Sequence, residues 1–206
     1  MKKLFFLMLC VLSLLLTSCS EQPQTVAKKE PPKPAEPVSG QSALFKMYQV
    51  ARASWSGDAR VLKMNSLHIA DVPTVIGKAG AWQATFASDK LGKTRTYTYS
   101  VEDGEGNLHK GVFASQEEAW SGKQGINTSF DIRSVSFDSN AAYETAIEKA
   151  GEYDKKNPGM PISFQLEQIN KFTTPVWRVI WGESVGTSNF SVYVDASLGH
   201  FLEKTH

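Results

Sequence analysis

The fold is decided near the C-terminus by the stretch Trp177-Arg178-Val179-Ile180-Trp181. Because successive side chains of a strand point to opposite faces, this stretch places Trp177, Val179 and Trp181 on one face. A second stretch, Trp82-Gln83-Ala84-Thr85-Phe86, has the same leading Trp and the same aromatic alternation. The two stretches predict equivalent strands in two halves of the chain, and they indicate an internal repeat.

The segments around these strands follow the same order in both halves. Apolar residues at helical spacing predict one helix after Ser42 and another after the capping residues Asp138-Ser139-Asn140. Strands are predicted at 61–69, 82–86 and 97–101, and again at 162–169, 177–181 and 190–194. Strands that are adjacent in sequence are usually neighbours in the sheet. We therefore expect an α+β fold in which each half is a curled antiparallel sheet packed on one helix.

The second half carries a family resemblance. The segment Pro175-Val176-Trp177-Arg178-Val179, followed by Val192-Tyr193-Val194-Asp195-Ala196-Ser197-Leu198-Gly199, resembles the C-terminal half of a PepSY domain, although Leu198 stands where Thr is common. The resemblance covers about 135–204 and reaches 42–113 only through the internal repeat. It implies a small α+β module of secreted and envelope proteins, which binds or restrains partner proteins and has no catalytic residues.

The N-terminus predicts how the chain is delivered. Lys2 and Lys3 precede an apolar run of 13 residues, Leu4 to Leu16, which is too short to span a bilayer. The run leads into Leu16-Thr17-Ser18-Cys19, which resembles a bacterial lipobox. That resemblance implies a lipoprotein signal peptide over 1–18, a lipid on Cys19 and, with Ser20 next, the periplasmic face of the outer membrane. The alternative is a soluble secreted protein with an incidental cysteine.

The residues after the lipobox predict a tether. Residues 20–41 contain five of the nine prolines and almost no large apolar side chain, a composition typical of an extended spacer. The predicted organisation is therefore a lipidated Cys and Pro-rich tether over 19–41, a first repeat over 42–125 and a PepSY-like second repeat over 126–206. A Pro-rich ligand for a groove-type receptor is the alternative for the tether.

Charge and cysteine content exclude several classes of function. Without Lys2 and Lys3 the mature chain would have 20 basic and 21 acidic residues, which gives no electrostatic case for nucleic-acid binding. Cys10 would leave with the signal peptide and Cys19 would be lipidated, so thiol chemistry is excluded. No cofactor is expected. The four histidines have no metal-site spacing, so no metal is expected either: they are His68, His109, His200 and His206.

One motif points to an enzyme instead. Gly182-Glu183-Ser184-Val185-Gly186 matches the nucleophile elbow of serine hydrolases, and Asp195 and His200 follow in triad order. However, a strand rather than a helix follows the Ser, and the three residues lie within 17 positions on one predicted hairpin. We interpret the motif as a hairpin loop and keep a serine hydrolase using Ser184 as the less favoured alternative.

The sequence therefore predicts a non-enzymatic, lipid-anchored module that binds a protein or peptide in the cell envelope through strand edges and hairpin loops. An envelope protease is one candidate partner, and a structural envelope component is the alternative function. Trp181, Glu183 and Asp195 are the predicted contact residues, because an exposed aromatic cluster near the 182–189 loop would suit partner binding.

Overall fold

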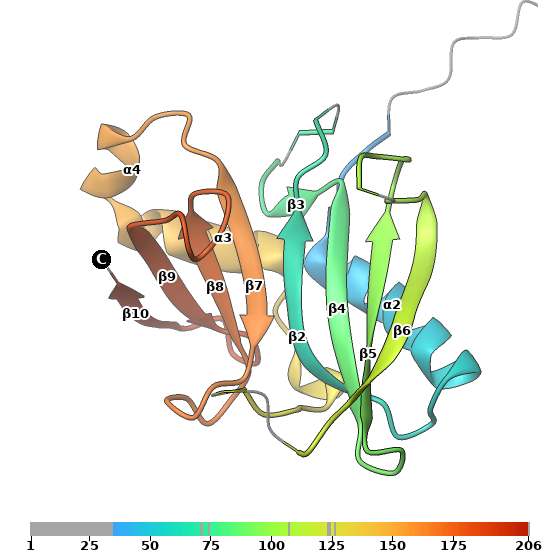
Figure 1. Cartoon of the computed structure of the whole chain (residues 1–206). Coiled ribbons are helices and arrows are strands. Elements are labelled where there is room, and N and C mark those ends of the chain that lie inside the picture. Colours follow the sequence, from blue (N-terminus) through green and yellow to red (C-terminus); the bar gives the residue numbers. More distant parts are fainter. Residues whose placement is uncertain are drawn as a thin grey trace, which may run out of the picture. The chain divides into compact units, whose positions relative to one another are not determined.

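Eight strands form one antiparallel sheet, and two long helices pack against one of its faces (Figure 1). This computed structural model describes residues 35–205, except for residues 71, 74, 107, 123, 124 and 126. The predicted α+β class is confirmed. The predicted signal peptide, Cys19 and most of the predicted tether lie outside the described residues.

The same succession of elements occurs twice. In the first half it consists of α2 (Gly40–Ser54), β2 (Arg60–Leu67), β4 (Ala81–Ser88), β5 (Lys93–Ser100) and β6 (Gly111–Ala119). In the second half it consists of α3 (Ser139–Ala150), β7 (Ile162–Glu167), β8 (Val176–Trp181), β9 (Phe190–Asp195) and β10 (Phe201–Thr205). The shorter elements are β1 (Val38–Ser39), β3 (Lys78–Ala79), the 3-10 helix η2 (Ile132–Ser134) and α4 (Glu152–Lys156).

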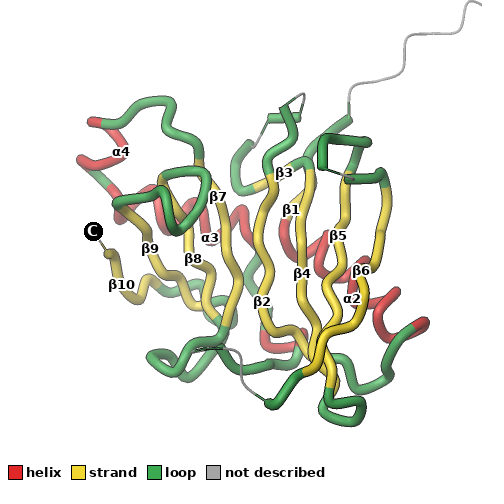
Figure 2. Tube along the Cα trace, in the orientation of Figure 1, coloured by secondary structure: helices red, strands yellow, loops and turns green. Residues whose placement is uncertain are grey.

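The two halves join through their first strands. The sheet order is β10-β9-β8-β7-β2-β4-β5-β6, so β7 and β2 are central neighbours (Figure 2). Their pairing is short and joins Lys63–Asn65 to Glu167–Gln165. The halves therefore share one sheet instead of forming the two separate curled sheets that we expected. Pairing β2 with β7 removes an exposed edge from each half, which is a physical reason for the fusion.

Each half also has a fourth strand beyond the three that the sequence predicts. β6 follows the turn after β5, and β10 follows the turn after β9. The run Ala114-Ser115-Gln116-Glu117-Glu118 has no apolar alternation, so β6 has no strand signal of its own.

The first helix begins earlier than predicted. α2 starts at Gly40 rather than after Ser42, and Val38–Ser39 pair with Lys78–Ala79. The folded part therefore includes the last residues of the predicted tether. Two of the first backbone donors of α2 are satisfied from the other half of the chain: Gly40 N donates to Ser139 Oγ (2.7 Å) and Gln41 N donates to Asp138 Oδ1 (2.8 Å).

Asp138 caps the second helix as predicted. Its side chain accepts a hydrogen bond from Ser139 N, and α3 then runs to Ala150. Gly151 ends this helix with a φ of 53°, a conformation that glycine adopts at low cost. Because Asp138 also accepts from Gln41 N, one carboxylate holds the N-termini of both long helices together.

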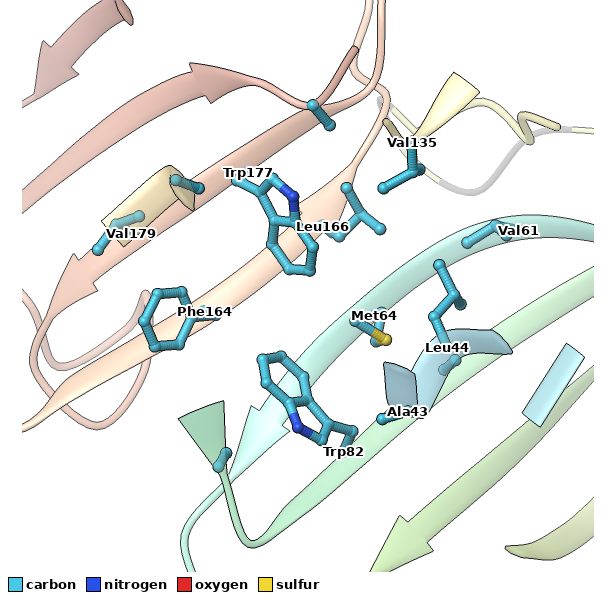
Figure 3. Packing of buried hydrophobic residues seen from close by; sticks show 14 of the residues in the cluster. Ala43, Leu44, Val61, Met64, Trp82, Val135, Phe164, Leu166, Trp177 and Val179 are labelled. Carbon is cyan, nitrogen blue, oxygen red and sulfur yellow. The ribbon is translucent and has the colours of Figure 1, made fainter. Parts of the chain in front are cut away.

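The main core lies between the helices and the sheet (Figure 3). The alternation that the sequence predicts is confirmed: Trp82, Ala84 and Phe86 are fully buried on one face of β4. On β8, Trp177, Val179 and Trp181 are buried in the same way. The indoles stay hydrogen-bonded inside the core, since Trp82 Nε1 donates to Val38 O and Trp177 Nε1 donates to Phe137 O.

Candidate functional site

The face of the sheet opposite the helices is the candidate binding surface. Both long helices pack on one face, and no helix of the described residues lies over the other, which faces the viewer in Figure 1. Residues directly opposite each other on neighbouring strands point to the same face, so the strand register aligns one side chain from every strand into a line. We call this line the cross-strand row; from β10 to β6 it consists of Glu203, Tyr193, Arg178, Gln165, Asn65, Gln83, Thr98 and Phe113.

The centre of the cross-strand row is made of amides. Gln165, Asn65 and Gln83 lie side by side on β7, β2 and β4, and each is half-buried. Their side-chain amides make no hydrogen bond to another residue of the described part of the chain. Each amide offers two donors and one acceptor. The middle of the sheet therefore presents neutral hydrogen-bonding groups that are free to bind a ligand.

A positioned cation, Arg178, lies near the β10 end of the row. Arg178 Nε donates to Ser191 Oγ (2.9 Å), and the guanidinium lies 5.2 Å from the centroid of the Tyr193 ring. Tyr193 in turn packs on Phe172, with ring centroids 5.3 Å apart. Burial raises the pKa of the Tyr193 hydroxyl, so this group stays a neutral donor at physiological pH. The contacts fix the Arg178 guanidinium on the open face.

The other end of the row borders a hollow. It has a volume of about 450 Å³ and lies over β4, β5 and β6. Its lining combines hydroxyls and an amide with two aromatic rings: Gln83, Thr96, Thr98, His109, Phe113, Ala114 and Ser115. Phe113 is 46% exposed, and its ring centroid lies 5.0 Å from that of His109. The hollow suits an apolar side chain whose backbone reaches the neighbouring polar groups.

A pair of charged residues lies beside the row where the two halves join. Lys63 on β2 is directly opposite Glu167 on β7. Glu167 is only 6% exposed, and desolvation raises the pKa of its carboxyl, against the opposing effects of Asn127, Arg178 and Lys63. Glu167 is directly opposite Val176, which is fully buried, so this part of the face is covered. Burial of the carboxylate makes the stability of the junction depend on pH.

Of the predicted contact residues, Trp181 belongs to the core. It is 1% exposed, its Nε1 donates to Asp154 Oδ1 (2.9 Å), and its ring meets Phe190 edge to face. The prediction of an exposed aromatic cluster around Trp181 is therefore wrong. Alternation within β8 is the reason, since it places Trp181 on the same inward face as Trp177.

Asp195 and Glu183 are also separated from each other. Asp195 is 7% exposed and shapes the turn after β9: its Oδ1 accepts from Ser197 N (2.7 Å) and Leu198 N (2.9 Å). Glu183 is exposed beside a cavity of about 70 Å³, where β2 and β7 diverge beyond their short pairing. The β8–β9 register places Trp181 opposite Phe190 and Asp195 opposite Val176, so the predicted contact residues lie at two ends of one hairpin.

The same register separates the residues of the elbow motif. Ser184 lies in the loop after β8, with its Oγ 3.0 Å from Thr187 Oγ1. Asp195 lies at the other end of the hairpin, where its N–H donates to His200 O. A strand rises roughly 3.3 Å per residue, so the length of β9 separates Ser184 from Asp195 and His200 by on the order of 15 Å. These three residues do not form a catalytic triad.

The sequence does not predict the cross-strand row, because the row arises from the pairing register between neighbouring strands. Asn65, Gln83 and Gln165 stand far apart in the sequence, at positions that simply alternate with core residues. Only β4 and β8 carry a local signal, because Gln83 and Arg178 each follow the leading Trp of their strand. Among the described residues there is no group of three or more His, Cys, Asp or Glu side chains placed to hold a metal, and no helix has the length and apolar character needed to cross a membrane.

Comparisons of the chain with protein-family models, with curated proteins and with solved structures found no match. The resemblance to the PepSY family therefore stays a prediction from the sequence.

Proposed function

We propose that this protein is a lipid-anchored envelope lipoprotein that binds a protein or peptide through the open face of its sheet, without chemical turnover. The observation that carries the proposal is the half-buried amide group of Gln165, Asn65 and Gln83, which lies at the centre of the sheet face that no described helix covers and makes no side-chain hydrogen bond to another described residue. Each amide supplies donors and an acceptor, and a bound polypeptide can pair with them through its own backbone groups.

The composition of the face supports a protein or peptide as the ligand. Interfaces are enriched in aromatic and Arg side chains that are fixed before binding, and such residues carry much of the binding energy. The cross-strand row has Arg178 stacked on Tyr193 at one side and the exposed Phe113 at the other, with neutral amides between them. The resemblance of the second half to PepSY domains favours an envelope protease as the partner.

The predicted anchor adds to this function. A domain on a lipid anchor and a Pro-rich tether searches a restricted volume near the membrane, which raises the effective concentration of any partner there. Substitution Cys19→Ala is expected to abolish incorporation of labelled palmitate and to release the protein from membranes, while the isolated chain keeps the same thermal unfolding curve.

A pull-down from native membranes tests the binding face. Gln83→Glu places a charge in the middle of the cross-strand row, whereas Gln49→Glu makes the same chemical change on an exposed position of α2. We expect Gln83→Glu to lower partner recovery about ten-fold, equivalent to roughly 1.4 kcal/mol, and Gln49→Glu to leave it unchanged. Equal recovery with both variants, when circular dichroism shows both folded, would contradict binding through this face.

A further inference from the structure

Strand β6 is an open edge of the sheet. It is nine residues long, among the described residues it pairs with β5 alone, and its last seven residues are all exposed. The opposite edge, β10, has five residues and includes Lys204. Natural proteins usually protect exposed edges with short strands, Lys, Pro or bulges. β6 contains neither Lys nor Pro and has one irregularity, opposite the step from Arg95 to Tyr97, so it is the more accessible edge.

The hydrogen-bond alternation shows which groups of β6 point outward. Trp120 N donates to Gly92 O at one end of the β5–β6 pair, and Val101 N donates to Gly80 O at the other end of β5. Residues of an inner antiparallel strand bond alternately to its two neighbours. Val101 bonds toward β4 and Gly92 bonds toward β6, so the even-numbered residues Thr94, Thr98 and Ser100 also bond toward β6. Their partners are Glu118, Phe113 and Gly111. It follows that the backbone groups of Val112, Ala114 and Glu117 face away from the sheet.

The side chains beside this edge define what it would accept. Phe113 and Glu118 both point to the open face, since they are opposite Thr98 and Thr94. Phe113 borders the hollow described above, and Glu118 is exposed at the far end of the strand. Residues 93–119 contain five acidic and three basic side chains. An added strand would therefore be matched by an apolar residue next to Phe113 and a basic residue next to Glu118.

We propose that β6 binds an extended, basic segment of the partner as an additional antiparallel strand, with an apolar side chain of that segment in the hollow beside Phe113. This inference rests on the proposed function and specifies the binding mode: backbone hydrogen bonds provide affinity, and the hollow and Glu118 provide specificity. A second copy of this chain fits less well, because an antiparallel pair of β6 strands that bond through the outward residues Ala114 and Glu117 would place Phe113 opposite Glu118.

The test uses a synthetic peptide as long as β6, made of alternating Thr and Val, with Lys near its N-terminus and Phe near its C-terminus. In the antiparallel orientation these residues lie opposite Glu118 and Phe113. Titration into the full-length, isotope-labelled chain in detergent micelles is expected to give saturable amide shifts concentrated at Val112, Ala114 and Glu117. The same peptide with Glu in place of Lys is expected to bind about ten-fold more weakly, and Glu118→Lys is expected to reverse that preference.

Two variants at one position separate backbone pairing from other effects. Ala114→Pro removes an outward N–H without removing a bond to β5, so it is expected to abolish the peptide-induced shifts. The matched control Ala114→Thr keeps the N–H and is expected to bind normally. Retained binding by Ala114→Pro would overturn strand addition, as would the absence of peptide-induced shifts at β6 in the unmodified chain.

The remaining outcomes separate this inference from the proposed function. Shifts at β6 that grow with protein concentration in the absence of peptide would mean that a second copy occupies the edge, and would overturn the partner strand. If Ala114→Pro recovers the envelope partner as well as the unmodified chain while Gln83→Glu does not, the edge inference fails and the binding face stands. If Gln83→Glu has no effect but the peptide binds β6, the binding face fails instead.

Discussion

The indole rings of Trp82 and Trp177 meet edge to face at the centre of the molecule, with ring centroids 6.2 Å apart and ring planes at 70°. The two residues occupy equivalent positions, near the start of the second large strand of each half. The contact therefore joins the two halves through the same residue of each, above the short pairing of β2 with β7. Aromatic pairs in this geometry contribute about 0.5–1.5 kcal/mol beyond the burial of their area.

Gly40 is the first test of this central contact. A Cβ at this position would lie 2.5 Å from Cη2 of Trp177 and 3.1 Å from Cη2 of Trp82. Because both indoles are fully buried and hydrogen-bonded, Gly40→Ala is expected to lower the free energy of unfolding by about 1–3 kcal/mol in urea denaturation. Gly57→Ala is the control, since nothing lies within 4 Å of its Cβ position. A larger loss for Gly57→Ala would contradict the packing described here.

Asp138 gives a second prediction about stability. Its Oδ1 accepts from Gln41 N (2.8 Å) and from Ser139 N (2.6 Å), so it serves the N-termini of α2 and α3 together. Loss of a single N-cap costs about 0.5–2 kcal/mol, and Asp138→Ala is expected near the top of that range in thermal or chemical unfolding. Asp89→Ala, at an exposed turn position, is expected to change stability by less than about 0.5 kcal/mol. Similar losses from both variants would rule out a double cap.

Glu167 predicts a dependence of stability on pH. Desolvation raises the pKa of its carboxyl in the folded state, so the folded chain holds this proton more tightly than the unfolded chain does. At pH values below its unfolded pKa the carboxyl is protonated in both states and carries no penalty for a buried charge. The free energy of unfolding falls as the pH rises above that value. Glu167→Gln is expected to stabilise the fold at neutral pH and to have little effect near pH 3. An equal effect of Glu144→Gln, on the exposed surface of α3, would refute the assignment to burial.

Ser184 tests the enzyme alternative. Because Ser184 lies at the opposite end of the β8–β9 hairpin from Asp195 and His200, no general base of the elbow motif is close enough to activate its hydroxyl. A fluorophosphonate probe for serine hydrolases is expected to leave the protein unlabelled. Labelling that disappears in Ser184→Ala, with the fold intact by circular dichroism, would show that the protein is an enzyme.

The sequence predicted those elements whose signal is local. The period-2 patterns around Trp82 and Trp177 gave β4 and β8, with the correct residues facing the core. The capping residue Asp138 gave the start of α3. In contrast, α2 takes its capping groups from residues 97 and 99 positions away, so the flanking sequence predicted a start after Ser42 instead of at Gly40.

The candidate site was less predictable than the fold because it depends on pairing between distant strands. Asn65 meets Gln165 only through the β2–β7 pairing, which fuses the two halves. The prediction of Trp181 as a contact residue depends on an exposed aromatic cluster, although the alternation within its own strand favours burial. That alternation alone places Trp181 in the core, whereas no local pattern identifies the cross-strand row.

Site-specific photocrosslinking in native membranes tests the central claim most directly. A benzophenone side chain placed at Gln165 or Thr98 reports contacts of the open face, and one placed at Gln49 reports contacts of the helix-covered side. We expect one discrete protein adduct from both open-face positions and none from Gln49. Adducts from Gln49 alone, or none from either open-face position when the same partner is recovered by pull-down, would contradict the assignment of the open sheet face as the binding surface.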